Sequence, residues 1–220
     1  MKTIIGIRPT GKLHIGHYFS VIKPALEEKA DVLVARYHAP TGNYMQLYRD
    51  LTEHNIHPII QKVYADVYFK LLNAAKFGEL KRMTQFKSKK PTPHLFVYPV
   101  LMAHDLVGYD RVIVGEDQRQ HVEYANVLFK RCGFKKIKGD FRGGRIMDLS
   151  DPTKKMSKSN PKGCLFLGED PTKKIMKAVT TKKGRENLIY LYKQLGGKKV
   201  PRLNKDLKIK LIELFNQQEK

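Results

Sequence analysis

Two short apolar, β-branched runs near the start of the chain constrain its fold most strongly. The first run, Thr3–Ile7, ends in the turn sequence Arg8-Pro9-Thr10-Gly11, and a helical pattern then extends from about His14 to Lys29. A second candidate for a buried strand, Val32–Ala35, follows directly. Two strand–helix units in so short a stretch predict an α/β protein with a parallel sheet.

Further strand and helix patterns follow along the rest of the chain. Further strands are expected at Ile59–Lys62, Arg111–Gly115 and Gly143–Leu149. Helices are expected at Ala65–Ala75, Phe77–Met83, Val97–Leu106 and Asp117–Arg131, and from Pro171 to the end with breaks at Gly196-Gly197 and Pro201. The predicted organisation is a nucleotide-binding domain at 1–150 with a short helical connecting insert at about 43–93. A polar loop and a short helical tail would occupy 151–220.

Charge is the first clue to function. The net charge of +21 lies mainly in residues 111–220 and favours a polyanionic partner, although charge alone does not separate RNA, DNA and anionic lipid. A lysine-rich surface without such a partner is the alternative. The sequence has no run near the roughly 20 apolar residues of a membrane span and no secretory signal, so we expect a cytoplasmic protein with no membrane partner. Cys132 and Cys164 are expected to be reduced thiols, and no metal-site spacing is present.

Two motifs carry candidate chemistry. His14-Ile15-Gly16-His17 lies after the first strand and its turn, where a helix begins and unpaired backbone N–H groups favour a phosphate. The two imidazoles can donate hydrogen bonds to phosphate oxygens, and Gly16 leaves room for a nucleotide against the backbone. Lys155-Met156-Ser157-Lys158-Ser159 lies in the polar loop, where two lysines three residues apart can close over the phosphates of a triphosphate. Each motif alone would be weak, because short matches are common.

Together, in this order and context, the two motifs resemble the signature pair of class I aminoacyl-tRNA synthetases. Further segments narrow the resemblance to the tryptophanyl-tRNA synthetase family, in a small, C-terminally shortened form. They are Arg8–Leu13, Gly78–Lys89, Tyr98–Asp105, Gly115–His121 and Arg145–Leu149. The resemblance extends from Met1 to about Thr180 and implies a doubly wound, Rossmann-type parallel sheet with a short C-terminal helical tail.

The resemblance also implies roles for individual residues. The implied catalytic residues are His14, His17, Lys89, Lys155 and Lys158. The implied ATP-binding residues are Arg8, Thr10, Gly16, Gly115, Asp117, Ile146, Met156 and Ser157. The implied amino-acid-binding residues are Tyr98, Met102, Asp105 and Gln118, with Asp105 as the acceptor for the indole N–H. No protein metal ligand is implied.

The implied reaction is the ATP-dependent activation of tryptophan and its transfer to tRNA, with ATP and Mg²⁺ as cofactors and a homodimer as the assembly. A buried acceptor such as Asp105 would reject phenylalanine but could accept a tyrosine hydroxyl, so tyrosine is the rival substrate. A non-catalytic RNA-binding paralogue, or an enzyme that loads another acceptor, are the remaining alternatives. Only 61 residues follow Ser159, where this family usually carries a longer helical region. We therefore expect the basic second half to grip the tRNA backbone in place of part of the missing region.

Overall fold

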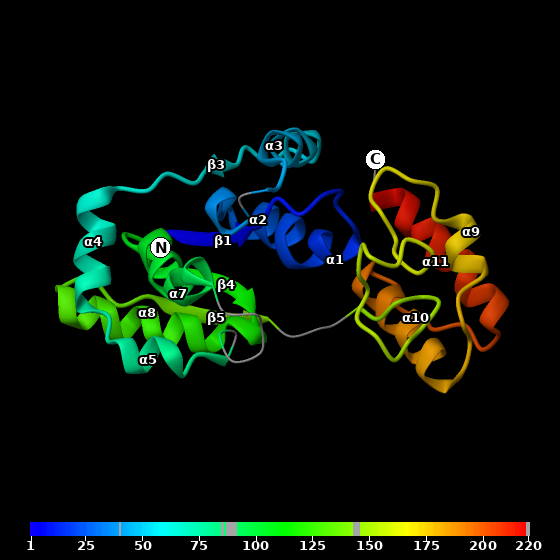
Figure 1. Cartoon of the computed structure of the whole chain (residues 1–220). Helices are drawn as coiled ribbons and strands as arrows, with labels where there is room; N and C mark the ends of the chain where they lie inside the picture. Colours follow the sequence, from blue (N-terminus) through cyan, green and yellow to red (C-terminus); the bar gives the residue numbers. More distant parts are fainter. Residues whose placement is uncertain (40, 85, 87–91, 143–145, 219–220) are drawn as a thin grey trace. The chain divides into compact units, whose positions relative to one another are not determined.

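A five-stranded sheet forms the centre of the larger part of the molecule (Figure 1). The computed structural model describes residues 1–39, 41–84, 86, 92–142 and 146–218. The strands are β1 Thr3–Ile7, β2 Asp31–Val34, β3 Ile59–Ile60, β4 Arg111–Gly115 and β5 Lys138–Arg142. They lie in the order β3-β2-β1-β4-β5, and every pairing is parallel. The expected parallel α/β sheet is confirmed.

The central strand is β1, which pairs with β2 on one edge and with β4 on the other. Ile5 lies opposite Val32 of β2 and Ile113 of β4, and all three are buried. Strands buried on both faces read as continuous apolar runs, which is why these strands were predictable. The next two strands in the sequence, β2 and β3, lie on one side of β1, and the last two, β4 and β5, lie on the other side. In open parallel sheets, ligands bind at the carboxyl ends of the strands at such a switch point.

The fifth strand is not where the sequence pattern put it. The expected strand at Gly143–Leu149 is wrong for the part that the structure describes, since Met147 makes only an isolated bridge with Lys155, and 143–145 lie outside the described residues. The strand is instead β5, with the polar sequence Lys-Gly-Asp-Phe-Arg. It lies at the edge of the sheet and is only partly buried, and edge strands are commonly charged.

The helix expected from about His14 to Lys29 is present but contains a change of pitch. It consists of α1 Ile15–His17, a π-helical turn Tyr18–Ile22, and α2 Lys23–Glu28. Pro24 is the second residue of α2, and proline has no N–H for the regular helical hydrogen bond, so a local change of pitch before it accommodates it. Lys29 ends α2 in the left-handed region, with φ of 51°.

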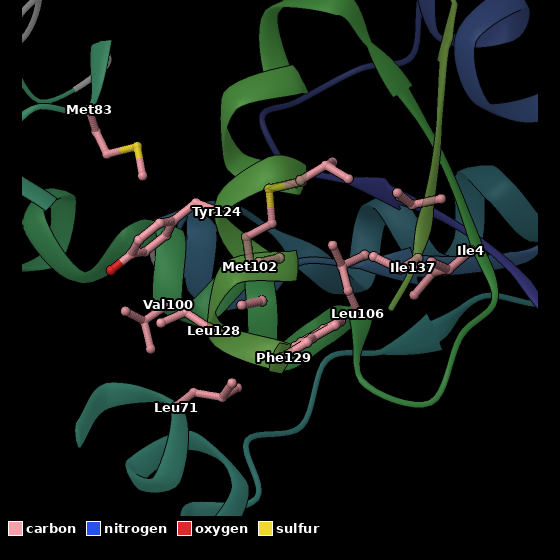
Figure 2. Packing of buried hydrophobic residues seen from close by; sticks show 14 of the residues in the cluster. Ile4, Leu71, Met83, Val100, Met102, Leu106, Tyr124, Leu128, Phe129 and Ile137 are labelled. Atoms are coloured by element: carbon pink, nitrogen blue, oxygen red, sulfur yellow. The ribbon is translucent and has the colours of Figure 1, made fainter. Parts of the chain in front are cut away.

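The remaining helices of the sheet-containing part pack against the sheet and each other. They are α3 Tyr44–Glu53, α4 Ala65–Ala74, α5 Phe77–Lys81, α7 Pro93–Leu106 and α8 Arg119–Cys132, with short 3₁₀ turns at Arg36–His38 and Glu116–Gln118. Helix α7 is buried over its C-terminal half, as expected, and packs against both α4 and α8. Figure 2 shows the shared core, with Leu71 from α4, Leu106 from α7 and Phe129 from α8.

The C-terminal part has a core of its own. Its helices are α9 Thr172–Met176, α10 Lys182–Gln194 and α11 Asn204–Gln218, which agree with the expected breaks at Gly196-Gly197 and Pro201. Leu188 and Leu191 of α10 pack in one buried cluster with Leu211 and Phe215 of α11. Ile15, from the start of the chain, belongs to the same cluster.

The chain accordingly divides into two compact units. The sheet unit consists of Met1–Gly11 and Ser20–Gly143, and the helical unit consists of Lys12–Phe19 and Gly144–Lys220. The segment that carries His14 and His17 therefore belongs to the same unit as the loop that carries Lys155 and Lys158.

One buried lysine ties the helical unit together. Lys208 of α11 is 8% exposed, and its Nζ donates hydrogen bonds of 2.8 Å to the carbonyl oxygens of Met176 and Ala178, at the end of α9. Burial lowers the pKa of this amine. The two hydrogen bonds compensate the cost of burying the amine and anchor α9 on α11.

We predict that Lys208→Met destabilises the protein by about 1–3 kcal/mol, because the carbonyl groups of Met176 and Ala178 lose their donor while the apolar stem is kept. Urea unfolding followed by circular dichroism measures this change. Lys205→Met, at an exposed position one turn earlier on α11, is the matched control and should change stability by less than about 0.5 kcal/mol. Equal stability of the two variants would contradict the assignment.

Candidate active site

The two histidine side chains of the first motif accept hydrogen bonds from backbone N–H groups of the same motif. His14 precedes α1, and its Nδ1 accepts a hydrogen bond of 3.0 Å from the backbone N–H of Gly16. The Nδ1 of His17 accepts one of 3.1 Å from the backbone N–H of His14. The ring centroids lie 4.0 Å apart. Because a backbone N–H can only donate, both Nδ1 atoms are lone-pair acceptors, and the proton of each neutral ring is on Nε2.

The electrostatic surroundings keep both rings neutral. Burial, together with the positive charges of Lys158 and Lys155, lowers the pKa of His14 from 6.5 to about 4. Burial, His14 and the same two lysines lower the pKa of His17 to about 2. At neutral pH the pair thus offers two Nε2–H donors without positive charge, and the lysines supply the charge. The structure brings the two predicted motifs together in one unit.

Gly16 is required by the position of the His14 ring. A Cβ atom at this position would lie 2.6 Å from Cε1 and 2.8 Å from Nδ1 of His14. Any larger residue would push the ring away from the Gly16 N–H that fixes its tautomer. Gly16 was predicted to leave room for a nucleotide, and the structure adds that it leaves room for the imidazole.

The loop that carries the two lysines is anchored by a short antiparallel pairing. The N–H of Met156 donates to the carbonyl of Ile146 at 2.9 Å, and Met147 bridges Lys155. Ile146 and Met156 are buried in the core of the helical unit, while Lys155 is exposed beside them. Ser157 Oγ lies 2.9 Å from Ser159 Oγ. Lys89, expected to join these residues, lies outside the described residues.

A buried carboxylate that sequence reasoning missed organises this loop. Asp148 is 2% exposed, and its Oδ1 accepts hydrogen bonds from the N–H and hydroxyl of Ser150 and from the N–H of Asp151. Its Oδ2 accepts one from the side chain of Asn160 at 2.9 Å, which ties the two ends of the loop together. A Cβ at Gly163 would overlap this carboxylate. An Asp side chain that accepts the backbone N–H two residues further on forms an Asx-turn, and Asp148 with Ser at the second following position was the available signal.

The sheet unit holds the residues assigned to the amino acid. Asp105 of α7 is buried, and its Oδ2 lies 2.8 Å from Nε2 of His38 and 2.7 Å from Nε2 of Gln61. Its Oδ1 lies 3.3 Å from Nδ1 of His104. Burial favours the neutral acid, but hydrogen bonds from His104, His38 and Gln61 outweigh it and hold the pKa of Asp105 below its ordinary value. Asp105 is therefore an ionised acceptor with three donors, and sequence reasoning had identified none of these donors.

Tyr98 and Met102 lie on the same helix as Asp105. The Tyr98 ring packs edge-on against His38, with centroids 4.5 Å apart, and also against His121. Met102 is buried in the core of the sheet unit. Burial raises the pKa of the Tyr98 hydroxyl, and the charges of Arg8, Asp105 and Asp117 also act on it. Tyr98 and Asp105 thus both contact His38.

The remaining predicted residues follow the carboxyl ends of β1 and β4, next to the switch point. Arg8 and Thr10 come directly after β1, and Gly115 ends β4. The Asp117 carboxylate accepts a hydrogen bond of 3.1 Å from the Gln118 amide. A Cβ at Gly115 would lie 2.5 Å from Oδ1 of Asp117, so glycine keeps that carboxylate close to the strand end.

A parallel sheet with a switch point is typical of a nucleotide-binding α/β protein. Neutral imidazoles beside lysines, which suit a phosphate group, agree with this class. A family model described as "tRNA synthetases class I (W and Y)" matches residues 64–217. The tryptophan–tRNA ligase of Tropheryma whipplei is 33% identical over 272 positions, covering 95% of this chain and 81% of that protein. The ligase of Mycoplasma genitalium is 34% identical, covering 81% and 65%. This chain belongs to the class I tRNA synthetase family of the tryptophan and tyrosine type.

Solved structures agree with this assignment. Tryptophanyl-tRNA synthetase from Mycoplasma pneumoniae has a TM-score of 0.78 at 29% identity, covering 100% of this chain and 88% of that one. Tyrosyl-tRNA synthetase from Aeropyrum pernix, at 20% identity, has a TM-score of 0.76 and shares the fold. No helix in the described part of the chain is long and apolar enough to cross a membrane.

The alignment also shows that this chain lacks segments that a relative has. The alignment with the Tropheryma whipplei ligase has 272 positions, more than the 220 residues of this chain. The relative therefore has residues within the aligned span that this chain lacks. This chain is therefore shorter than that relative inside the aligned span.

The lowered histidine pKa values predict a loss of stability in acid. Because the pKa values of folded His14 and His17, about 4 and about 2, lie below the value of 6.5 for an unfolded histidine, the unfolded chain binds protons that the folded chain does not. The free energy of unfolding should therefore fall as the pH drops from 6.5 toward 4. His17→Asn, whose amide oxygen can replace Nδ1 as acceptor, should reduce this fall.

Urea unfolding of the wild type and His17→Asn at about pH 7.5, 6 and 5 gives the free energy of unfolding at each pH. The slope of this free energy against pH reports how many more protons the unfolded chain binds. His57→Asn changes an exposed histidine of the sheet unit and is the control. If His57→Asn reduces the acid-induced loss as much as His17→Asn does, the assignment to the site histidines is wrong.

Proposed function

We propose that this protein activates tryptophan with ATP and transfers the aminoacyl group to tRNA. The observation that carries the proposal is the set of two neutral imidazoles and two lysines in the helical unit. Their donors and charges match the needs of a triphosphate. The relatives named tryptophan–tRNA ligases support tryptophan as the substrate. A tryptophanyl-tRNA synthetase from Campylobacter jejuni, solved with ADP and tryptophan, supports the nucleotide.

The chemistry requires alignment and charge rather than a protein nucleophile. A carboxylate oxygen of the amino acid attacks the α-phosphorus, a P–O bond forms, and the bond to the bridging oxygen breaks as pyrophosphate leaves. Negative charge then accumulates on the leaving group. The Nε2–H groups of His14 and His17 donate to its oxygens, while Lys155 and Lys158 neutralise it. Imidazoles with pKa values of about 4 and about 2 are poor proton acceptors, so we assign them as hydrogen-bond donors only.

Magnesium enters this scheme with the nucleotide. Among the described residues, no group of three His, Cys, Asp or Glu side chains could hold a metal ion. Mg²⁺ is commonly held by substrate phosphates with few protein ligands. We therefore assign Mg-ATP as the substrate, and the chain's contribution is the imidazole and lysine set.

Asp105 is proposed as the group that selects the amino acid. An ionised, buried acceptor favours a side chain with a ring donor and disfavours phenylalanine, which would leave the acceptor unpaired. Indole N–H and phenol O–H are both donors, so tyrosine remains the competing substrate. Met102 and Tyr98, on the same helix, are proposed to border the ring.

A basic surface on the helical unit is proposed to hold the tRNA. Ten exposed lysines and arginines lie between residues 171 and 218, and none of them forms an ion pair with a described residue. They are Lys173, Lys177, Lys182, Lys183, Lys193, Lys198, Lys199, Arg202, Lys205 and Lys210. Hydrogen bonds from Arg185 to Pro201 and Asn204 bring the starts of α10 and α11 together, which concentrates part of this charge. Such a surface fits a phosphate backbone.

We also propose a homodimer that acts in the cytoplasm, where tRNA charging serves translation. Tyr64, Phe69 and Phe77 of the sheet unit are 64%, 56% and 70% exposed, respectively. Exposed large aromatic side chains on one part of the chain favour a protein contact. The second copy of the chain is the partner that the family resemblance implies.

ATP–pyrophosphate exchange tests the activation step. We expect exchange with tryptophan and at most weak exchange with tyrosine. Exchange with tyrosine alone would change the assigned substrate. No exchange with either amino acid, together with tight RNA binding unaffected by ATP, would instead support a non-catalytic RNA-binding role. Analysis of the charged product separates tRNA from another acceptor.

Charge removal tests the tRNA surface. Lys182→Ala/Lys183→Ala and Lys198→Ala/Lys199→Ala should each weaken tRNA binding and lower the slope of binding against salt by about 1–2, since each lost phosphate contact contributes about 1. Filter binding across a salt series measures this slope, with exchange activity measured in parallel. Lys62→Ala/Lys76→Ala on the sheet unit is the control. An equal loss of tRNA binding and exchange would count against a dedicated RNA surface.

A further inference from the structure

The imidazole of His104, next to Asp105, has both ring nitrogens in hydrogen bonds. His104 of α7 is 6% exposed. Its Nε2 lies 3.1 Å from the backbone nitrogen of Tyr64, which follows β3, and its Nδ1 lies 3.3 Å from Oδ1 of Asp105. A backbone N–H can only donate, so Nε2 is the acceptor and Nδ1 carries the proton. His104 therefore donates to Asp105 in a tautomer that the backbone fixes.

The other oxygen of Asp105 has no room for a further donor. Its Oδ2 receives the side chains of His38 and Gln61 at 2.8 and 2.7 Å. The orientation of Gln61 is itself fixed, because its Oε1 accepts the backbone N–H of Tyr37 at 2.8 Å. A carboxylate oxygen offers about two lone-pair sites. Oδ2 is thus filled, whereas Oδ1 has one donor among the residues that the structure describes, His104, and a second lone-pair site beside it.

We propose that His104 is a positioning residue that presents the free site of Asp105 Oδ1 to the ring donor of the bound amino acid. This inference rests on the proposed function, in which Asp105 receives that donor. His104 acts through Asp105 and does not itself touch the substrate. Its second hydrogen bond joins the carboxylate to the segment between β3 and α4, so the backbone at Tyr64 sets the direction of the acceptor.

The alternative is that His104 merely fills space in the core. Its ring stacks with Tyr64, with centroids 6.0 Å apart, and meets Tyr68 edge-on at 6.3 Å. A residue needed only for packing would affect stability, and it would affect all kinetic constants together. A positioning residue would affect the amino acid and leave ATP unaffected. The two roles therefore predict different effects of a His104 substitution on the kinetic constants for the amino acid and for ATP.

Three substitutions of His104 test the roles of Nδ1 and Nε2 separately. The amide nitrogen of His104→Asn can occupy the place of Nδ1 and donate to Asp105, although Tyr64 loses its acceptor. The amide of His104→Gln reaches the place of Nε2 and leaves Asp105 without its donor. His104→Ala provides neither group. His57→Asn again serves as the control at an exposed position.

We expect His104→Gln and His104→Ala to raise KM for the amino acid about tenfold in ATP–pyrophosphate exchange, which corresponds to about 1.4 kcal/mol. KM for ATP should stay within about twofold. His104→Asn should remain within about threefold of the wild type for both substrates, because the hydrogen bond to Asp105 persists. Similar KM values for all three variants, or a parallel rise of KM for ATP, would overturn the proposal.

Direct binding provides a readout independent of catalysis. The chain contains no tryptophan, so fluorescence excited at the red edge of the indole absorption comes from the added amino acid alone, and its anisotropy rises as the amino acid binds. Fluorescence anisotropy of tryptophan should show the same order of affinities, with wild type and Asn above Gln and Ala. If the wild type neither binds tryptophan nor supports exchange with tryptophan or tyrosine, the proposed function fails. If the wild type binds and all variants bind equally, only the role of His104 fails.

Discussion

The pairing of β1 on both of its edges is the constraint on which the sheet unit depends. Because β2 and β4 flank β1, the chain must cross from one side of the sheet to the other, and the strand ends on either side of this crossing face a common region. Arg8 and Thr10 follow one of these ends, while Gly115 closes the other. The burial of β1 thus stabilises the unit and also decides where its polar loops can meet a ligand.

Backbone amides fix imidazoles at three positions in this molecule. The N–H groups of Gly16, His14 and Tyr64 each donate to one nitrogen of a histidine, in the rings of His14, His17 and His104 respectively. Each such bond fixes the tautomer, so the opposite nitrogen carries a proton in a known direction. A main-chain group cannot rotate away as a hydroxyl can. The donors are therefore oriented before any ligand binds, which reduces the reorganisation required in a reaction.

The predictable and unpredictable parts of the structure differ in physical character. β1, β2 and β4 were evident because strands buried on both faces are apolar throughout, whereas β5 was missed because a sheet edge tolerates charge. The two motifs predicted which imidazoles and lysines share the candidate site, but not the tautomers, which depend on individual hydrogen bonds. Gln61 and His104 were missed because each lies in an apolar stretch, and only the fold brings them to Asp105.

The division of the chain into units has a consequence for dissecting the molecule. Ile15 is 1% exposed within the core of the helical unit, although it lies near the start of the chain and is followed by the rest of the sheet unit. No single cut in the polypeptide separates the two units intact, because one of them is assembled from two distant stretches. A gene fragment that encodes only the C-terminal region would lack a piece of its own interior.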